Sequence, residues 1–74
     1  MVSSSLAGSI WKISVEPGHI VERAEETLLI LEAMKTEIRI EAGEESVGRR
    51  VKGFGRNVRQ GAYVTAGEPL VILE

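Results

Sequence analysis

The sequence contains no cysteine, which excludes disulfide bonds and thiolate metal ligands and is compatible with a reducing compartment. It also has no aspartate and a single histidine, His19, too few groups for a metal site or a nucleophilic triad. No apolar run is longer than that from Leu28 to Leu31, which is too short to span a bilayer. The first residues lack the basic start and apolar segment of a secretory signal. We therefore predict a cytoplasmic domain without a metal site and without membrane contact.

The chain is short, and its composition is that of a folded protein. Its 74 residues allow one domain, 1–74, with 43% hydrophobic and 27% charged residues. A domain of this size buries only about 60% of the surface that its unfolded chain exposes. The chain stops directly after its last apolar run, as a C-terminal module taken from a longer enzyme would.

Two internal repeats divide the chain into related halves. The segment ETLLILE (26–32) matches EPLVILE (68–74) at five of seven positions, with an offset of 42. The pattern V-x-x-G-x-x-V occurs at 15–21 and again at 58–64, with an offset of 43. Each half is too small to bury its own apolar face, so the repeats predict two halves related by a pseudo-twofold axis.

The periodicity of apolar residues indicates strands throughout. Ile38 and Ile40 alternate with charged residues, as in a half-buried strand, whereas the runs 27–31 and 69–73 are apolar on both faces. Pro17, Gly18 and Gly61 mark turns, and no window has a helical period with caps. We predict an all-β fold, a flattened barrel or sandwich whose two halves each have about four short strands.

The apolar pattern also fixes a hairpin register. Pairing Leu31 with Ile38 and Leu29 with Ile40 brings the apolar faces of two antiparallel strands together. This register leaves a two-residue turn at 34–35. The hydrophobic pattern therefore predicts the position of the turn without any motif.

Met34 and Lys35 are poor residues for such a turn. Two-residue hairpin turns require positive φ, which Asn-Gly and Asp-Gly adopt most easily. The same register places Glu32 opposite Glu37, a like-charge pair that costs a few tenths of a kcal/mol. Positions that break local rules are often functional, so Lys35 becomes the candidate site.

Ala33-Met34-Lys35 resembles the Ala-Met-Lys signature of biotinyl domains, the biotin carboxyl carrier modules of biotin-dependent carboxylases. The resemblance covers nearly the whole chain, and the related lipoyl domains instead have Asp before the modified Lys. The matching frames are G-S-I-W-K-I-x-V-x-P-G-x-x-V (8–21), E-x-T-L-L-I-L-E-A-M-K-T-E-I (25–38) and G-x-x-V-x-x-G-x-P-L-V-I-L (61–73).

This resemblance implies a biotinyl/lipoyl-like fold with the modified Lys35 at a hairpin tip. Biotin would be attached covalently to Lys35 by a biotin protein ligase, with Ala33 and Met34 contributing to ligase recognition. The domain itself would have no catalytic residues. It would carry carboxybiotin from a biotin carboxylase site to a carboxyltransferase site.

The prediction of the carboxyl acceptor depends on fewer residues than the prediction of a biotin carrier. Many members have Met or Leu after the modified Lys, whereas this chain has Thr36. EAMKTE (32–37) together with the early GSIWK (8–12) is most similar to the carrier domains of urea carboxylases and urea amidolyases. The alternatives are a carrier domain of an acyl-CoA or pyruvate type carboxylase and a lipoyl carrier domain.

The basic stretch 48–59 raises the alternative of nucleic-acid binding. Lys52-Gly53-Phe54-Gly55 (52–55) matches the first four positions of an RNA-binding strand motif, but Arg56 and Asn57 replace the Phe and Val that should follow. A complete module would also need helices. We predict a solvated basic edge and no nucleic-acid partner.

Three local expectations complete the prediction. The fit to the family is worst at 43–56, where we expect a looser loop before the strand of the second half. His19 follows a Pro-Gly pair and should be an exposed turn residue. Trp11 should pack in the small core.

Overall fold

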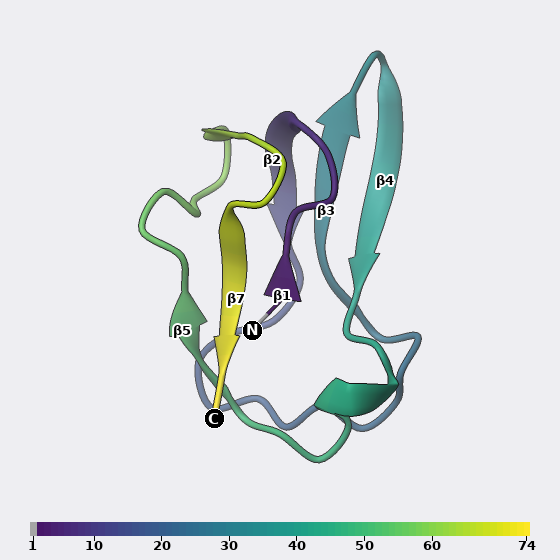
Figure 1. The fold of residues 1–74 in the computed structure, drawn as a ribbon, viewed down its shortest axis with the longest axis vertical. Helices are drawn as coiled ribbons and strands as arrows, with labels where there is room; N and C mark the ends of the chain where they lie inside the picture. Colours follow the sequence, from purple (N-terminus) through teal and green to yellow (C-terminus); the bar gives the residue numbers. More distant parts are fainter. Residues whose placement is uncertain (1) are drawn as a thin grey trace.

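The computed structural model describes residues 2–74 (Figure 1). This part of the chain contains no helix with the length and hydrophobicity needed to cross a bilayer. Its elements are β1 (Val2–Ser3), β2 (Gly8–Ile13), β3 (Thr27–Ala33), β4 (Thr36–Glu41), the 3-10 helix η1 (Glu44–Ser46), β5 (Val51–Phe54), β6 (Tyr63–Val64) and β7 (Pro69–Leu73).

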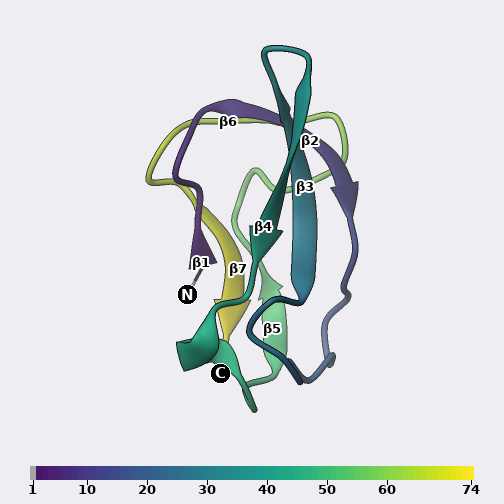
Figure 2. The ribbon, with the colours of Figure 1, turned by 90° about the vertical axis from the view of Figure 1, so that its right-hand side faces the viewer.

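The strands form two antiparallel sheets that pack face to face (Figures 1 and 2). One sheet has the order β1-β7-β5 and the other has the order β4-β3-β2-β6. The predicted all-β architecture is confirmed, and of the two forms considered the flattened sandwich fits. The sheets do not close into a barrel.

The predicted relation between the halves is visible in the hydrogen bonds. Gly61 donates its N–H to the carbonyl of Ile10 at 2.7 Å, and Gly18 donates equivalently to the carbonyl of Val51 at 2.8 Å. An isolated bridge between Ile20 and Arg50 extends the β1-β7-β5 sheet beyond β5. Ile20 thus occupies the edge position that β6 occupies in the four-stranded sheet. Counting this bridge, each sheet has four strand positions, and the two halves exchange one short strand each, β1 and β6.

The core lies between the sheets and consists of aliphatic side chains. Leu28, Leu29 and Leu31 of β3 are fully buried, as are Leu70 and Val71 of β7. These are the two repeated apolar runs, so the segments that looked two-sided in sequence are the central strands of their sheets. The remaining core residues are Ile10, Val21, Ile40, Ala42, Val51, Val64 and Leu73.

Trp11 lies outside this core, and the prediction that it packs there is wrong. The register of β2 against β3 shifts between Ile10 and Lys12, so Trp11 occupies a β-bulge. A bulge adds one residue to a strand and changes the direction of the side chains around it. As a result the Trp11 side chain is 45% exposed, while its neighbour Ile10 is buried.

The segment 43–56 is more ordered than its sequence suggested. Gly43 and Gly48 have φ of 87°, a conformation that glycine adopts without steric cost. Their N–H groups donate to the carbonyls of Ala24 and Val21, each at 2.8 Å. Strand β5 follows, so the second half forms its strand as expected, after a hydrogen-bonded connection rather than a loose loop.

Candidate functional site

The hairpin of β3 and β4 has the register that the apolar pattern predicts. Leu31 pairs with Ile38 and Leu29 with Ile40, and the pairing ends at Ala33 opposite Thr36. The turn at 34–35 is the outermost point of the molecule along its long axis (Figures 1 and 2). The fold therefore presents these two residues beyond both sheets.

Both turn residues have left-handed backbone conformations. Met34 has φ of 51° and Lys35 has φ of 65°, as a type I′ turn requires. Residues with a Cβ atom lose about 1–2 kcal/mol each in this region. The paired strands below the turn enforce a conformation that the turn residues themselves do not favour.

The tip is open to solvent on all sides. The Met34 side chain is 96% exposed, and Lys35 is exposed as well. Two ion pairs are formed among residues 2–74, His19–Glu26 and Arg23–Glu25, and neither involves Lys35. An amine in this position can be reached by a large enzyme, and a long acyl chain attached to it would meet no obstacle.

The end of the hairpin next to the tip is held closely by β2. Gly8 lies beside the strand end at 32–33, and a Cβ atom added to Gly8 would come within 2.8 Å of the Glu32 carbonyl oxygen. Ala33, half-buried, lies on the same side at 3.4 Å from that position. The absence of a side chain at residue 8 lets β2 support the last paired residues before the tip. Gly8 is the first residue of the family motif at 8–21, but the sequence alone does not show why a glycine is needed at this position.

Comparison with known proteins agrees with this geometry. The family described as "Biotin-requiring enzyme", which groups biotin and lipoyl attachment domains, matches residues 1–73. The chain is 36% identical over 72 residues to the biotin/lipoyl attachment protein of Bacillus subtilis (strain 168), a match that covers 97% of this chain and 90% of that protein. The chain belongs to the biotin/lipoyl attachment family.

A solved structure extends the comparison. The structure of a single-chain, multi-domain long-chain acyl-CoA carboxylase matches 96% of this chain with a TM-score of 0.74 and 27% identity. The matched region is 7% of that enzyme, so the similarity concerns one domain of a much longer chain. Together with the family match, this similarity identifies the chain as a biotin carrier domain, and its cofactor is biotin.

The tip of this carrier domain suits a covalently attached group rather than a ligand held noncovalently in a cavity. Biotin attached through its carboxyl group needs a single accessible amine and no enclosing cavity. Ala33, Met34 and Lys35 lie together there, as their adjacency in the sequence requires, with Lys35 at the second turn position.

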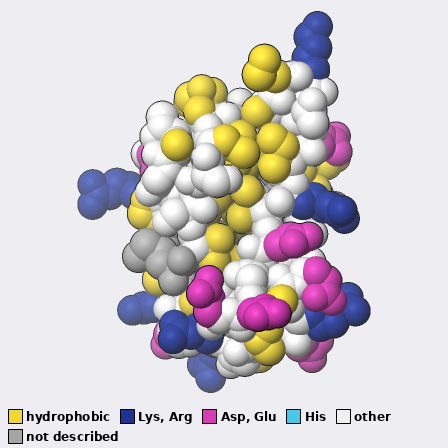
Figure 3. Space-filling model, turned by 45° about the vertical axis from the view of Figure 1, so that its right-hand side comes forward, with side chains coloured by type: hydrophobic (Ala, Val, Ile, Leu, Met, Phe, Trp, Pro, Cys, Tyr) yellow, Lys and Arg dark blue, Asp and Glu magenta, His cyan; other side chains and the backbone are white. Residues whose placement is uncertain are grey.

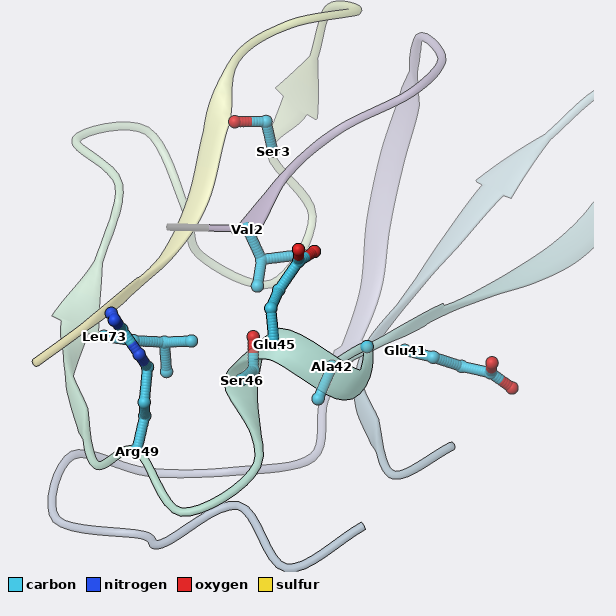
Figure 4. Close-up of a pocket in the computed structure, with 9 residues that line it drawn as sticks. Val2, Ser3, Glu41, Ala42, Glu45, Ser46, Arg49 and Leu73 are labelled. Atoms are coloured by element: carbon cyan, nitrogen blue, oxygen red, sulfur yellow. The ribbon is translucent and has the colours of Figure 1, made fainter. Parts of the chain in front are cut away.

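A pocket of about 500 Å³ lies at the other end of the carrier domain (Figure 4). It is lined by the beginning of β1, the ends of β4 and β7, and η1, so it is remote from the tip. Glu45 and Arg49 extend along its walls, whereas Glu41 points away (Figure 4). The described residues contain no group of three or more acidic, His or Cys side chains that could hold a metal ion.

His19 also lies away from the tip, and it is less exposed than predicted. Its Nε2 atom contacts Oε2 of Glu26, and the ring is half-buried. Burial raises the pKa of the Glu26 carboxyl, but this is outweighed by hydrogen bonds from the Glu22 backbone, His19 and the Arg23 backbone and by the charge of His19. The pKa of Glu26 is therefore lower than its ordinary value of 4.5.

Figure 3 shows how charge is distributed on one face of the domain. Acidic side chains gather toward the end opposite the hairpin, while hydrophobic side chains continue from near the hairpin into the middle of this face. The basic residues of the stretch 48–59 are exposed, as expected for a solvated basic edge.

Proposed function

We propose that Lys35 is the residue that carries biotin. The observation that supports this proposal is the turn at 34–35, which holds an exposed lysine at the outermost point of the domain in a backbone conformation unfavourable for it. A biotin protein ligase would supply an activated biotinyl group. The Nζ atom of Lys35 would attack its carbonyl carbon, the activating group would leave, and the amine would lose its proton.

The role of the protein is to position the group. Attachment at the tip removes the positive charge of Lys35 and leaves a long arm held away from the sheets. Biotin attached to Lys35 would supply a ring that can hold a carboxyl group between two enzyme sites. Tethering raises the effective concentration of the ring at both sites. The partners that we propose are the ligase, a biotin carboxylase and a carboxyltransferase.

For the acceptor we propose urea, which would make the parent enzyme a urea carboxylase. The support is the sequence around the tip, EAMKTE with Thr36, together with GSIWK at 8–12. An acyl-CoA acceptor is the second candidate, favoured by the structural similarity to a long-chain acyl-CoA carboxylase. Carboxyl transfer to urea or to acyl-CoA, measured with the biotinylated domain and each class of carboxylase, distinguishes the two.

Intact mass after incubation with ligase, biotin and ATP tests the attachment site. The chain has two other lysines, Lys12 and Lys52, which serve as internal controls. One biotinyl group should be added to the wild type and to Lys12→Arg and Lys52→Arg, and none to Lys35→Arg. Addition of biotin to Lys35→Arg would refute the proposal, and so would a lipoyl group added in preference to biotin under matched conditions.

A further inference from the structure

The strand register aligns residues of the four-stranded sheet into rows that cross it. The row nearest the tip contains Glu37, Glu32, Ser9 and Tyr63, one residue from each strand. The next row contains Arg39, Ile30 and Lys12. With a rise of about 3.3 Å per residue, these rows lie about 7 and 13 Å below the turn.

These rows lie on the outer face of the sheet. Leu29 and Leu31 are fully buried toward the core, and successive side chains of a strand point to opposite faces, so Ile30 and Glu32 point outward. Ser9 pairs with Glu32 on one side and with Tyr63 on the other, so Tyr63 lies on the same face. Its side chain is 64% exposed. This outer face therefore continues directly into the tip.

Trp11 joins Tyr63 on this face. Ile10 is buried, so the bulge residue Trp11 points to the opposite, outer side, two residues along β2 from the partner of Tyr63. Gly61 donates its N–H to the Ile10 carbonyl, and a Cβ atom added at Gly61 would meet nothing within 4 Å, so the space beside this part of β2 is open. The bulge that excludes Trp11 from the core thus places a second aromatic ring near Tyr63.

Basic side chains border the aromatic pair. Lys12 and Arg39 are exposed at either side of the half-buried Ile30, and neither forms an ion pair within the part of the chain that the structure describes. Glu32 and Glu37 are exposed on the same face, one row nearer the tip, so a complementary surface would offer apolar pockets, carboxylates opposite Lys12 and Arg39, and hydrogen-bond donors opposite the glutamates. Tryptophan, tyrosine and arginine are the residues that most often dominate the binding energy of protein interfaces.

The chemistry at Lys35 indicates which partner must cover this face. An enzyme that acylates Nζ has to bring its own active site to within the length of the lysine side chain, so its surface must approach the rows beside the tip. An enzyme that acts on the biotin ring reaches it through the additional length of the arm. Of these enzymes, the acylating enzyme therefore has the greatest need to contact the surface beside the tip.

We propose that Trp11 and Tyr63 anchor the enzyme that acylates Lys35, with Lys12 and Arg39 meeting carboxylates on its surface. The inference rests on the proposed function of Lys35 and extends it to a docking face. This face determines affinity for the carrier domain, whereas the chemical step takes place at the tip.

Steady-state biotinylation of Trp11→Thr and Tyr63→Thr by a biotin protein ligase tests the proposal. We expect the KM for the domain to rise about tenfold or more for each variant, with kcat within about twofold, as for a lost interface anchor. Val47→Thr is the matched control, because Val47 is also 45% exposed but follows η1, remote from the tip. Its KM should equal that of the wild type.

A second measurement needs no variant and does not depend on folding of the substituted chains. Trp11 is the single tryptophan, so the labelled domain has one indole N–H resonance. Unlabelled ligase should shift or broaden it, and added salt should weaken the effect because charged contacts are screened. An indole resonance unchanged at saturating ligase overturns the proposal.

The kinetic results separate this proposal from the proposed function. If the wild type is biotinylated on Lys35 but Trp11→Thr and Tyr63→Thr retain the wild-type KM, the docking face is wrong and the attachment site stands. A rise in KM as large for Val47→Thr also overturns the docking face. If the wild type takes no biotin, the proposed function fails, and the docking face fails with it.

Discussion

Glu32 and Glu37 lie directly opposite each other across the hairpin, each two residues from the turn. Both are exposed, and like charges in directly opposed positions destabilise a strand pair by about 0.2–1 kcal/mol. Glu37→Gln should therefore increase the free energy of unfolding by this amount, and the increase should shrink at high salt. Chemical denaturation of the wild type and the variant measures both effects.

Glu41→Gln is the control for that experiment. Glu41 is exposed on the same strand but pairs with Thr27, so its substitution should leave the free energy of unfolding nearly unchanged. Equal effects at the two positions would show that general charge reduction, and not the cross-strand pair, is responsible.

Lys35→Gly should make the domain more stable while preventing biotinylation. Lys35 has φ of 65°, a conformation that glycine adopts without the steric cost of a Cβ atom. We expect a gain of about 1 kcal/mol, measured by thermal or chemical unfolding. Lys35→Arg also removes the proposed attachment site but should give no such gain. A destabilised Lys35→Gly variant would contradict the turn geometry.

Gly55→Ala should destabilise the domain by about 2 kcal/mol or more, because overpacking against rigid backbone forces the strands apart. A Cβ atom at Gly55 would lie 2.0 Å from the Pro69 carbonyl oxygen and 2.9 Å from its carbon. Gly53, also near the end of β5, has no atom within 4 Å of an added Cβ. Gly53→Ala should therefore be neutral or slightly stabilising, and thermal unfolding of the two variants compares them directly.

The carboxyl of Glu26 should make stability depend on pH in the acidic range. Its folded-state pKa lies below the ordinary value of 4.5, so the ionised form contributes stability above that pH. The contribution is lost as the pH falls through the lower, folded-state pKa. The difference in unfolding free energy between the wild type and Glu26→Gln should therefore shrink as the pH falls below about 4.5.

His19 provides the control for this pH dependence. It hydrogen-bonds to Glu26 and contributes to the lowered pKa, so Glu26→Gln should have a smaller, less pH-dependent effect in a His19→Gln background. An effect of the same size at every pH in both backgrounds would show that the contact does not stabilise the folded state.

The hairpin was predictable because apolar alternation alone defines it. Leu29, Leu31, Ile38 and Ile40 must share the buried face, and a shift of one residue would expose all four. The two-sheet architecture followed from the repeats for a similar reason, since each half needs the other to bury its apolar runs. The register then places the turn at 34–35, which contains the lysine proposed as the attachment site.

Features that depend on contacts between distant segments were not predictable. The bulge at Trp11 adds a residue without changing the composition of β2, so the sequence gives no sign that the ring leaves the core. The contact of His19 with Glu26 joins two turns whose separation depends on the fold. The close approach of Gly55 to Pro69 likewise exists only after β5 and β7 pair.

The pseudo-twofold relation has a mechanical consequence for any longer polypeptide that contains the domain. In one half the central strand β3 is joined to edge strand β4 by the tip, whereas in the other half the equivalent strands β7 and β1 pair without a connecting turn. The free end of β7 lies toward the pole opposite the tip (Figure 1). A tether joined there would pull along the long axis and away from the arm, so it could swing the whole domain between enzymes without obstructing Lys35.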